Sequence, residues 1–192
     1  MKRVILVHGW SGNPNNAWFP WLRKKIEENG FEVVVPAMPH PDEPTIEDWI
    51  GHLKEVVKNP DKDTYFIGHS IGCQTIMRYL QALPDDAKIG GVIFVAGFFN
   101  LYFLKTEDEK RIAKPWLEIP INTEKIKTMT KNIAAIFSDN DPDVALSDKE
   151  IFEKRLGAKT TVEHAKGHFS DDAGVKELPV VLNELVKMEK SK

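Results

Sequence analysis

The chain has 192 residues, and its 26 Lys and Arg against 29 Asp and Glu give a formal net charge of -3 at pH 7, which excludes the strongly basic surface of a nucleic-acid-binding protein. Hydrophobic residues make up 42% of the chain, so it can bury one sizeable core, and we expect a single globular domain over residues 1–192. One cysteine excludes an intramolecular disulfide, and the longest apolar run (90–99) is too short to cross a bilayer. No signal-peptide core follows Met1. We therefore expect a cytoplasmic protein without membrane insertion.

Short apolar runs alternate with helix-like stretches along most of the chain. We predict, in chain order, a strand at 4–7, a helix at 17–29, a strand at 31–35, a helix at 45–58, a strand at 64–67, a helix at 71–83, strands at 89–96 and 133–137, a helix at 147–156, a strand at 160–164 and a helix at 173–188. This alternation predicts an α/β fold, with a mainly parallel sheet of about six strands and helices on both faces.

Residues 97–131 interrupt this alternation. The segment holds aromatic residues, among them Phe98, Phe99 and Trp116, together with many charged residues. It is too short for an independent domain. We therefore interpret it as an excursion over the ends of the strands that contains short helices.

The most informative residues are Gly68-His69-Ser70-Ile71-Gly72, which match the G-x-S-x-G nucleophile elbow. They lie between a predicted strand and a predicted helix, where an elbow must lie, because the serine has to occupy a strained turn that exposes its hydroxyl. Side chains at positions 68 and 72 would clash with the neighbouring strand and helix, and glycine removes them. Ser70 is therefore the candidate nucleophile.

A serine nucleophile needs a base to take its proton and an acid to orient that base. Asp141 follows the predicted strand at 133–137, and His168 follows the predicted strand at 160–164. In a parallel sheet these loops meet at the edge that carries Ser70. The order Ser, Asp, His along the chain is also the order found in α/β-hydrolases.

Several residues compete for these two roles. Asp139 and Asp143 are alternatives to Asp141, and all three are also ordinary turn residues. Asp141 is favoured because the Asp-Pro pair that it begins resembles a loop of known hydrolases. His168 is favoured as the base over the alternative of a surface histidine, whereas His69 is expected to pack or to bond the backbone.

The tetrahedral intermediate of acyl transfer carries an oxyanion, which needs fixed N–H donors. We expect the first donor to be the backbone N–H of Ile71, directly after the candidate nucleophile. The second is expected from Trp10, because the preceding Gly9 lets the backbone turn toward a substrate. The alternative for this loop (8–12) is a glycine-rich turn without chemistry, and its glycines match neither the dinucleotide-binding nor the P-loop pattern.

Other candidate residues have structural alternatives. Cys73, one helical turn after Ser70, is better explained as a small buried residue than as a reactive thiol. Five aromatic residues either line an acyl-binding pocket or pack in the core: Trp10, Phe98, Phe99, Trp18 and Trp21. Four histidines show no metal-ligand spacing: His8, His40, His52 and His164. We therefore expect no metal site and no other cofactor.

Four motifs make the chain resemble a small α/β-hydrolase: His8-Gly9-Trp10, the elbow, Asp141-Pro142 and Gly167-His168-Phe169. More narrowly, it resembles the retinoblastoma-binding protein 9 / YdeN-like serine hydrolases. The resemblance covers nearly the whole chain and includes its short length. It implies a compact α/β-hydrolase fold without a large cap domain, and a Ser-His-Asp triad at Ser70, His168 and Asp141.

These observations predict a serine hydrolase that cleaves a carboxylic ester or a related acyl bond through an acyl-enzyme intermediate. We expect a small-molecule acyl substrate as its partner and no cofactor. A peptidase or amidase with the same triad is one alternative, and a non-catalytic protein-binding module that keeps the fold is another. The complete triad argues against the binding module but does not separate an ester from an amide. Both a monomer and a dimer are compatible with the sequence.

Overall fold

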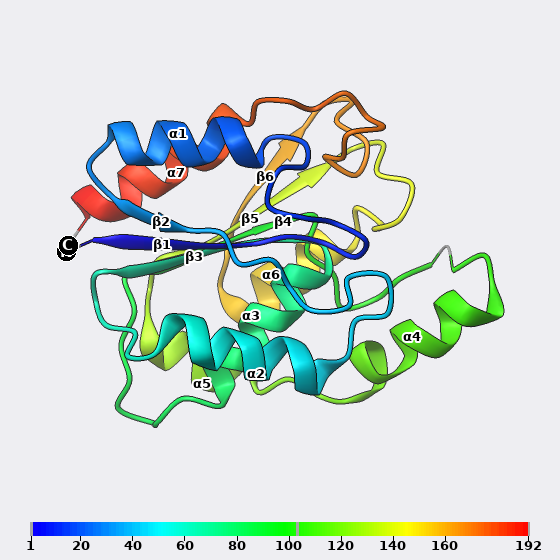
Figure 1. Ribbon diagram of the computed structural model, residues 1–192, viewed down its shortest axis with the longest axis horizontal. Helices are drawn as coiled ribbons and strands as arrows, with labels where there is room; N and C mark the ends of the chain where they lie inside the picture. The colour runs from blue at the N-terminus through cyan, green and yellow to red at the C-terminus, as the bar shows by residue number, and fades with distance from the viewer. Residues whose placement is uncertain (1, 103, 192) are drawn as a thin grey trace.

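The computed structural model describes residues 2–102 and 104–191. Within them, six parallel strands form one sheet in the order β2-β1-β3-β4-β5-β6 (Figure 1). The strands are β1 (Arg3–Val7), β2 (Glu32–Val34), β3 (Thr64–His69), β4 (Gly91–Val95), β5 (Ile133–Ser138) and β6 (Lys159–Glu163). The central strands β3, β4 and β5 are buried along their whole length, because helices cover both faces. The predicted parallel sheet of about six strands is confirmed.

The described residues form seven helices around this sheet: α1 (Phe19–Glu28), α2 (Ile46–Val57), α3 (Ile71–Gln81), α4 (Glu107–Glu118), α5 (Thr123–Met129), α6 (Asp148–Leu156) and α7 (Pro179–Lys190). Figure 1 shows α1 and α7 on one face and α2, α3, α5 and α6 on the other. Each face has its own apolar cluster, one around Leu22 and Leu185 and one around Leu53 and Ile76. None of the described helices has the length and apolarity that a bilayer crossing requires.

The predicted elements are found with shifts at their ends, and the shifts at the starts of α1 and α7 have local causes. α1 begins at Phe19 rather than at Ala17, because Ala17 has a φ of 49° and Pro20 occupies the first helical turn. α7 begins at Pro179 rather than at 173, because Gly174 has a φ of 69° and proline is suited to the first helical position.

Residues 97–131 contain α4 and α5, as the expectation of short helices required. Two buried charged side chains hold this segment in place. At its start, the Asp148 carboxylate accepts the N–H of Phe99 at 2.6 Å. Further on, the Arg78 guanidinium donates to the carbonyls of Trp116 and Ile119, each at 2.8 Å. These contacts fix the end of α4, which lies on the side of the sheet toward which the strands point (Figure 1).

Candidate active site

Ser70 occupies the sharp turn between β3 and α3. Its φ of 53° and ψ of -123° lie outside the regions that non-glycine residues favour. Backbone hydrogen bonds hold this conformation, because the Ser70 N–H donates to Val95 and the Ser70 carbonyl accepts from Cys73, both at 2.9 Å. The residue as a whole is 8% exposed. The predicted strained turn is therefore present.

The elbow glycines are required by the packing around them. A Cβ at Gly68 would lie 2.8 Å from the backbone nitrogen of Cys73. A Cβ at Gly72 would lie 2.4 Å from the carbonyl oxygen of Val7 and 2.6 Å from that of His8. Both approaches involve backbone, which cannot swing aside as a flexible side chain can. The steric reason predicted for these two glycines is confirmed.

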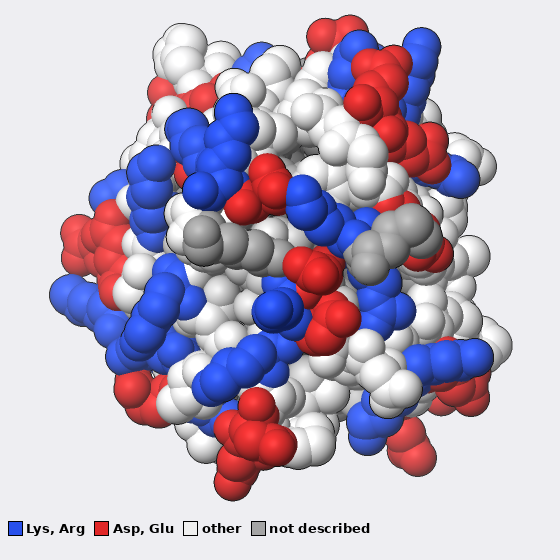
Figure 2. Space-filling model, turned by 90° about the vertical axis from the view of Figure 1, so that its left-hand side faces the viewer, with Lys and Arg blue, Asp and Glu red and all other residues white. Residues whose placement is uncertain are grey.

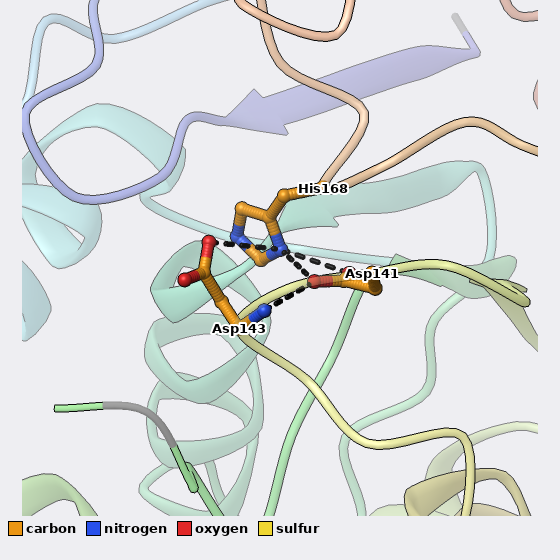
Figure 3. A group of neighbouring side chains, drawn as sticks. All are labelled: Asp141, Asp143 and His168. Atoms are coloured by element: carbon orange, nitrogen blue, oxygen red, sulfur yellow. Dashed lines mark hydrogen bonds and ion pairs between the residues drawn. The ribbon is translucent and has the colours of Figure 1, made fainter.

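Asp141, in the loop after β5, bonds to His168, in the loop after β6. The His168 Nδ1–H donates to both carboxylate oxygens of Asp141, at 3.0 and 2.9 Å (Figure 3). The Asp141 side chain is only 3% exposed, and its Oδ1 also accepts the backbone N–H groups of Asp143 at 2.8 Å and Val144 at 3.0 Å. With Nδ1 protonated in this way, the Nε2 of His168 is left as the basic nitrogen of the neutral ring.

The other two candidate aspartates are placed differently. Asp139 bonds to His164 at 2.6 Å, and its hydrogen bonds, chiefly from the Ala165 N–H, lower the pKa of its carboxyl. Asp143 is 47% exposed, and its Oδ2 lies 3.9 Å from the His168 Nδ1.

Together, Asp141, Asp143 and His168 place one ligand atom each within 4.8 Å of one another, a grouping that can also hold a metal ion. Sequence reasoning did not identify this group, because His168 lies 27 positions from Asp141 along the chain.

His69 supports the loop that carries His168. Its Nε2–H donates to the His168 carbonyl at 2.7 Å, and the two ring centroids are 5.0 Å apart. Burial, with a smaller contribution from the neighbouring His168, lowers the pKa of His69 to about 3, so the His69 ring is neutral at physiological pH. The prediction that His69 packs or bonds the backbone is confirmed.

His8 supports the loop after β1, a role that sequence reasoning did not assign to it. Its Nδ1–H donates to the Gly9 carbonyl at 2.8 Å, and its Nε2 accepts the Met38 N–H at 3.0 Å. Burial lowers the pKa of His8, which keeps it in the neutral form that this pair of bonds requires. The loop after β1 is thereby tied to the segment that follows β2.

This loop lies directly against the elbow. A Cβ at Gly9 would be 3.0 Å from the His69 Nδ1 and 3.2 Å from the Ser70 Cβ. Two of the loop's amides are used internally, because Ser11 donates to Pro41 at 2.8 Å and Gly12 donates to Gly9 at 3.1 Å. The loop is thus held in a defined conformation beside the candidate nucleophile.

The two predicted oxyanion donors lie in this region. The Trp10 N–H has no hydrogen-bond acceptor in the described part of the chain, although its indole Nε1–H donates to the Asp42 carbonyl at 3.0 Å. Ile71 is the first residue of α3, and the first N–H groups of a helix have no acceptor within it. Both amides are therefore suited to an oxyanion, and their role there stays a prediction.

A cavity of about 470 Å³ opens over Ser70 and His168. Trp10 forms part of its wall, and the 97–131 segment contributes the aliphatic side chains of Leu101, Leu104 and Ile112. A second cavity of about 320 Å³ adjoins the first and shares part of its lining, including Trp10 and His69. Ser70 and His168 therefore face one space that can receive a small molecule.

Other aromatic and thiol candidates lie away from this space. Phe98 is 1% exposed and packs in the core, and Phe99 packs on Phe152 with the ring centroids 4.9 Å apart. Neither residue lines the cavity, so the core alternative describes both, whereas Trp10 does line it. Cys73 is fully buried, and burial raises the pKa of its thiol, as expected for a small core residue.

Comparisons with known proteins agree with this architecture. The model of a family described as serine hydrolase matches residues 4–187. The chain is 33% identical over 186 residues to YdeN of Bacillus subtilis (strain 168), covering 96% of this chain and 94% of YdeN. It is 27% identical over 192 residues to the serine hydrolase RBBP9 of Rattus norvegicus, covering 98% of this chain and 94% of that protein.

Solved structures show the same likeness. The crystal structure of the ydeN gene product from B. subtilis has a TM-score of 0.90 at 30% identity, covering 99% of this chain and 100% of that one. Est1E from Butyrivibrio proteoclasticus, solved with ferulic acid bound, has a TM-score of 0.72 at 17% identity, covering 97% of this chain and 90% of that one. The second likeness shows a shared fold.

Proposed function

The chain belongs to the YdeN/RBBP9-like serine hydrolase family of the α/β-hydrolase superfamily, and from this premise we propose that it hydrolyses carboxylic esters with Ser70 as the nucleophile. In this proposal His168 is the base and Asp141 the acid that orients it. The observation that carries the proposal is the bond from the His168 Nδ1–H to both oxygens of Asp141, with His168 and Ser70 lining one cavity.

The proposed reaction has two halves. The Ser70 Oγ attacks the ester carbonyl carbon while the Nε2 of His168 takes the hydroxyl proton, and the Asp141 carboxylate stabilises the imidazolium that forms. The N–H groups of Ile71 and Trp10 bind the oxyanion. The imidazolium then gives its proton to the alcohol oxygen, which leaves. Water attacks the acyl-serine in the same way, with His168 again as the base, and releases the acid.

The cavity supports an acyl group of modest size. Leu101, Leu104 and Ile112 give one side of the site an apolar wall, and its volume of about 470 Å³ lies toward the small end of ligand pockets. We therefore propose small-molecule esters as the substrates, with p-nitrophenyl acetate as a first probe.

The test is hydrolysis of p-nitrophenyl acetate by the wild-type protein and by Ser70→Ala, His168→Ala and Asp141→Asn. Each substitution is expected to lower kcat by about 10³-fold or more, because the triad members act as a unit. Circular dichroism checks that each variant remains folded. Turnover of a matched amide substrate distinguishes an esterase from the peptidase or amidase alternative. Folded wild-type protein without turnover, or turnover that survives Ser70→Ala, would contradict the proposal.

A further inference from the structure

Among the described residues, every Asp, Glu, Lys or Arg that lines the two adjoining cavities at the candidate active site is acidic. Six carboxylates, from four separate segments, line these cavities: Asp42, Asp108, Glu109, Asp143, Asp171 and Asp172. Among the described residues, no Lys or Arg lines either one. The whole chain has 26 basic against 29 acidic residues, so its composition does not account for this imbalance.

Half of these carboxylates are compensated by neighbours. Asp108 pairs with Arg111 at 3.3 Å, Asp171 pairs with Lys176, and Glu109 accepts backbone N–H groups at the start of α4. The other three have no Lys or Arg within ion-pair distance in the described part of the chain: Asp42, Asp143 and Asp172. The site therefore carries an uncompensated negative charge.

The opposite end of the sheet carries side chains of both charges. Figure 2 shows the face at the amino ends of the strands, where Lys and Arg are numerous and acidic residues lie among them. Two surface hollows on this side are lined by five lysines: Lys62, Lys88, Lys131, Lys159 and Lys187. Lysines thus outnumber carboxylates in these two hollows, which also contain Asp63 and Glu184, whereas the cavities at Ser70 contain carboxylates and no Lys or Arg among the described residues.

We propose that the preferred substrates carry a positive charge close to the scissile acyl bond, an inference that rests on the proposed function. An ammonium group would be attracted into the cavities, where walls of low polarity strengthen the field of the carboxylates. An ester with an anionic acyl group would be repelled by the same field. The carboxylate product of hydrolysis would also be repelled, which favours its release.

Three p-nitrophenyl esters test this. The first is the ester of γ-trimethylammoniobutyrate, whose acyl group is cationic. The second has the neutral acyl group of the same shape, with a quaternary carbon in place of the nitrogen. The third is the monoester of glutarate, whose acyl group is anionic. At about 20 mM NaCl, we expect kcat/KM for the cationic ester to exceed that of the neutral one by about tenfold, with the anionic ester slowest. At about 500 mM NaCl, screening is expected to reduce these differences.

Two double variants locate the source of the preference. Asp42→Asn/Asp172→Asn removes one uncompensated carboxylate from each cavity and is expected to reduce the cationic-to-neutral ratio of kcat/KM. Glu55→Gln/Asp86→Asn removes two exposed carboxylates that line neither cavity and is expected to leave the ratio unchanged.

The outcomes separate this inference from the function on which it rests. Equal kcat/KM for the three esters, or a preference that persists in Asp42→Asn/Asp172→Asn, overturns the charge selection while esterase activity stands. Absence of turnover for all three esters, together with no labelling of Ser70 by a fluorophosphonate, overturns the proposed function itself.

Discussion

Replacing Gly72 with alanine is expected to disrupt the contact between α3 and the end of β1. The added Cβ would lie 2.4 Å from the Val7 carbonyl oxygen and 2.6 Å from that of His8, so the two backbones would have to separate by about 1 Å. Overpacking of a rigid interior costs about 1–3 kcal/mol, and this contact is purely backbone, so we expect a loss of about 3 kcal/mol in the free energy of unfolding. Activity is expected to fall as well, because the same contact places Ser70 beside the loop after β1.

Gly51 provides the matched control, because it is also helical and a Cβ there would meet nothing within 4 Å. Gly51→Ala is expected to raise the free energy of unfolding by up to about 1 kcal/mol through helix propensity. Equilibrium unfolding in urea, followed by circular dichroism, measures both changes. The shift in the transition midpoint gives the change in the free energy of unfolding, provided that the dependence of this free energy on urea concentration is the same in both variants. If Gly72→Ala proved as stable as Gly51→Ala, the steric reasoning for the elbow would be refuted.

Three further predictions concern buried groups. Folding lowers the pKa of His69 from 6.5 to about 3, so between these pH values the unfolded chain binds a proton that the folded chain does not. The free energy of unfolding should therefore fall as pH drops from 6.5 toward 3, by at most about 1.4 kcal/mol per pH unit from this residue. In urea unfolding across this range, His69→Gln should reduce the dependence on pH, and an unchanged dependence would contradict the assignment. The thiol of Cys73 is buried and its pKa is raised, so Ellman's reagent should modify it only as fast as the chain unfolds, and rapid modification of native protein would be inconsistent with its burial. The Arg78 Nη2 donates to the carbonyls of both Trp116 and Ile119, and Arg78→Lys keeps the charge but replaces the planar guanidinium with an ammonium on a shorter side chain. We expect the free energy of unfolding to fall by about 1–3 kcal/mol in the same urea assay, whereas no loss would show that these bonds do not hold α4.

The features that sequence reasoning predicted are those set by local stereochemistry. Gly68 and Gly72 indicated a turn too tight for side chains, and the backbone around Ser70 has that conformation. Continuous apolar runs indicated strands buried on both faces, and the sheet topology then placed the loops of Asp141 and His168 at one edge.

The features that sequence reasoning missed depend on contacts between distant segments. Neither Asp148 nor Arg78 resembles an anchor in the sequence, because their partners are backbone groups whose positions follow from the folded 97–131 segment. Phe98 and Phe99 have the composition of a pocket wall, yet whether an aromatic side chain faces a cavity or the core is decided by tertiary packing. The acidity of the site escaped notice for the same reason, since its carboxylates come from four separate segments.

The proposed mechanism requires Ser70 to be a nucleophile that His168 activates. Treatment of the folded protein with a fluorophosphonate, followed by peptide mass spectrometry to locate the adduct, tests this requirement. We predict one adduct, on Ser70, that is absent from Ser70→Ala and forms about 10³-fold more slowly in His168→Ala. An adduct on another residue, or labelling of Ser70 at the same rate without the imidazole, would contradict the account.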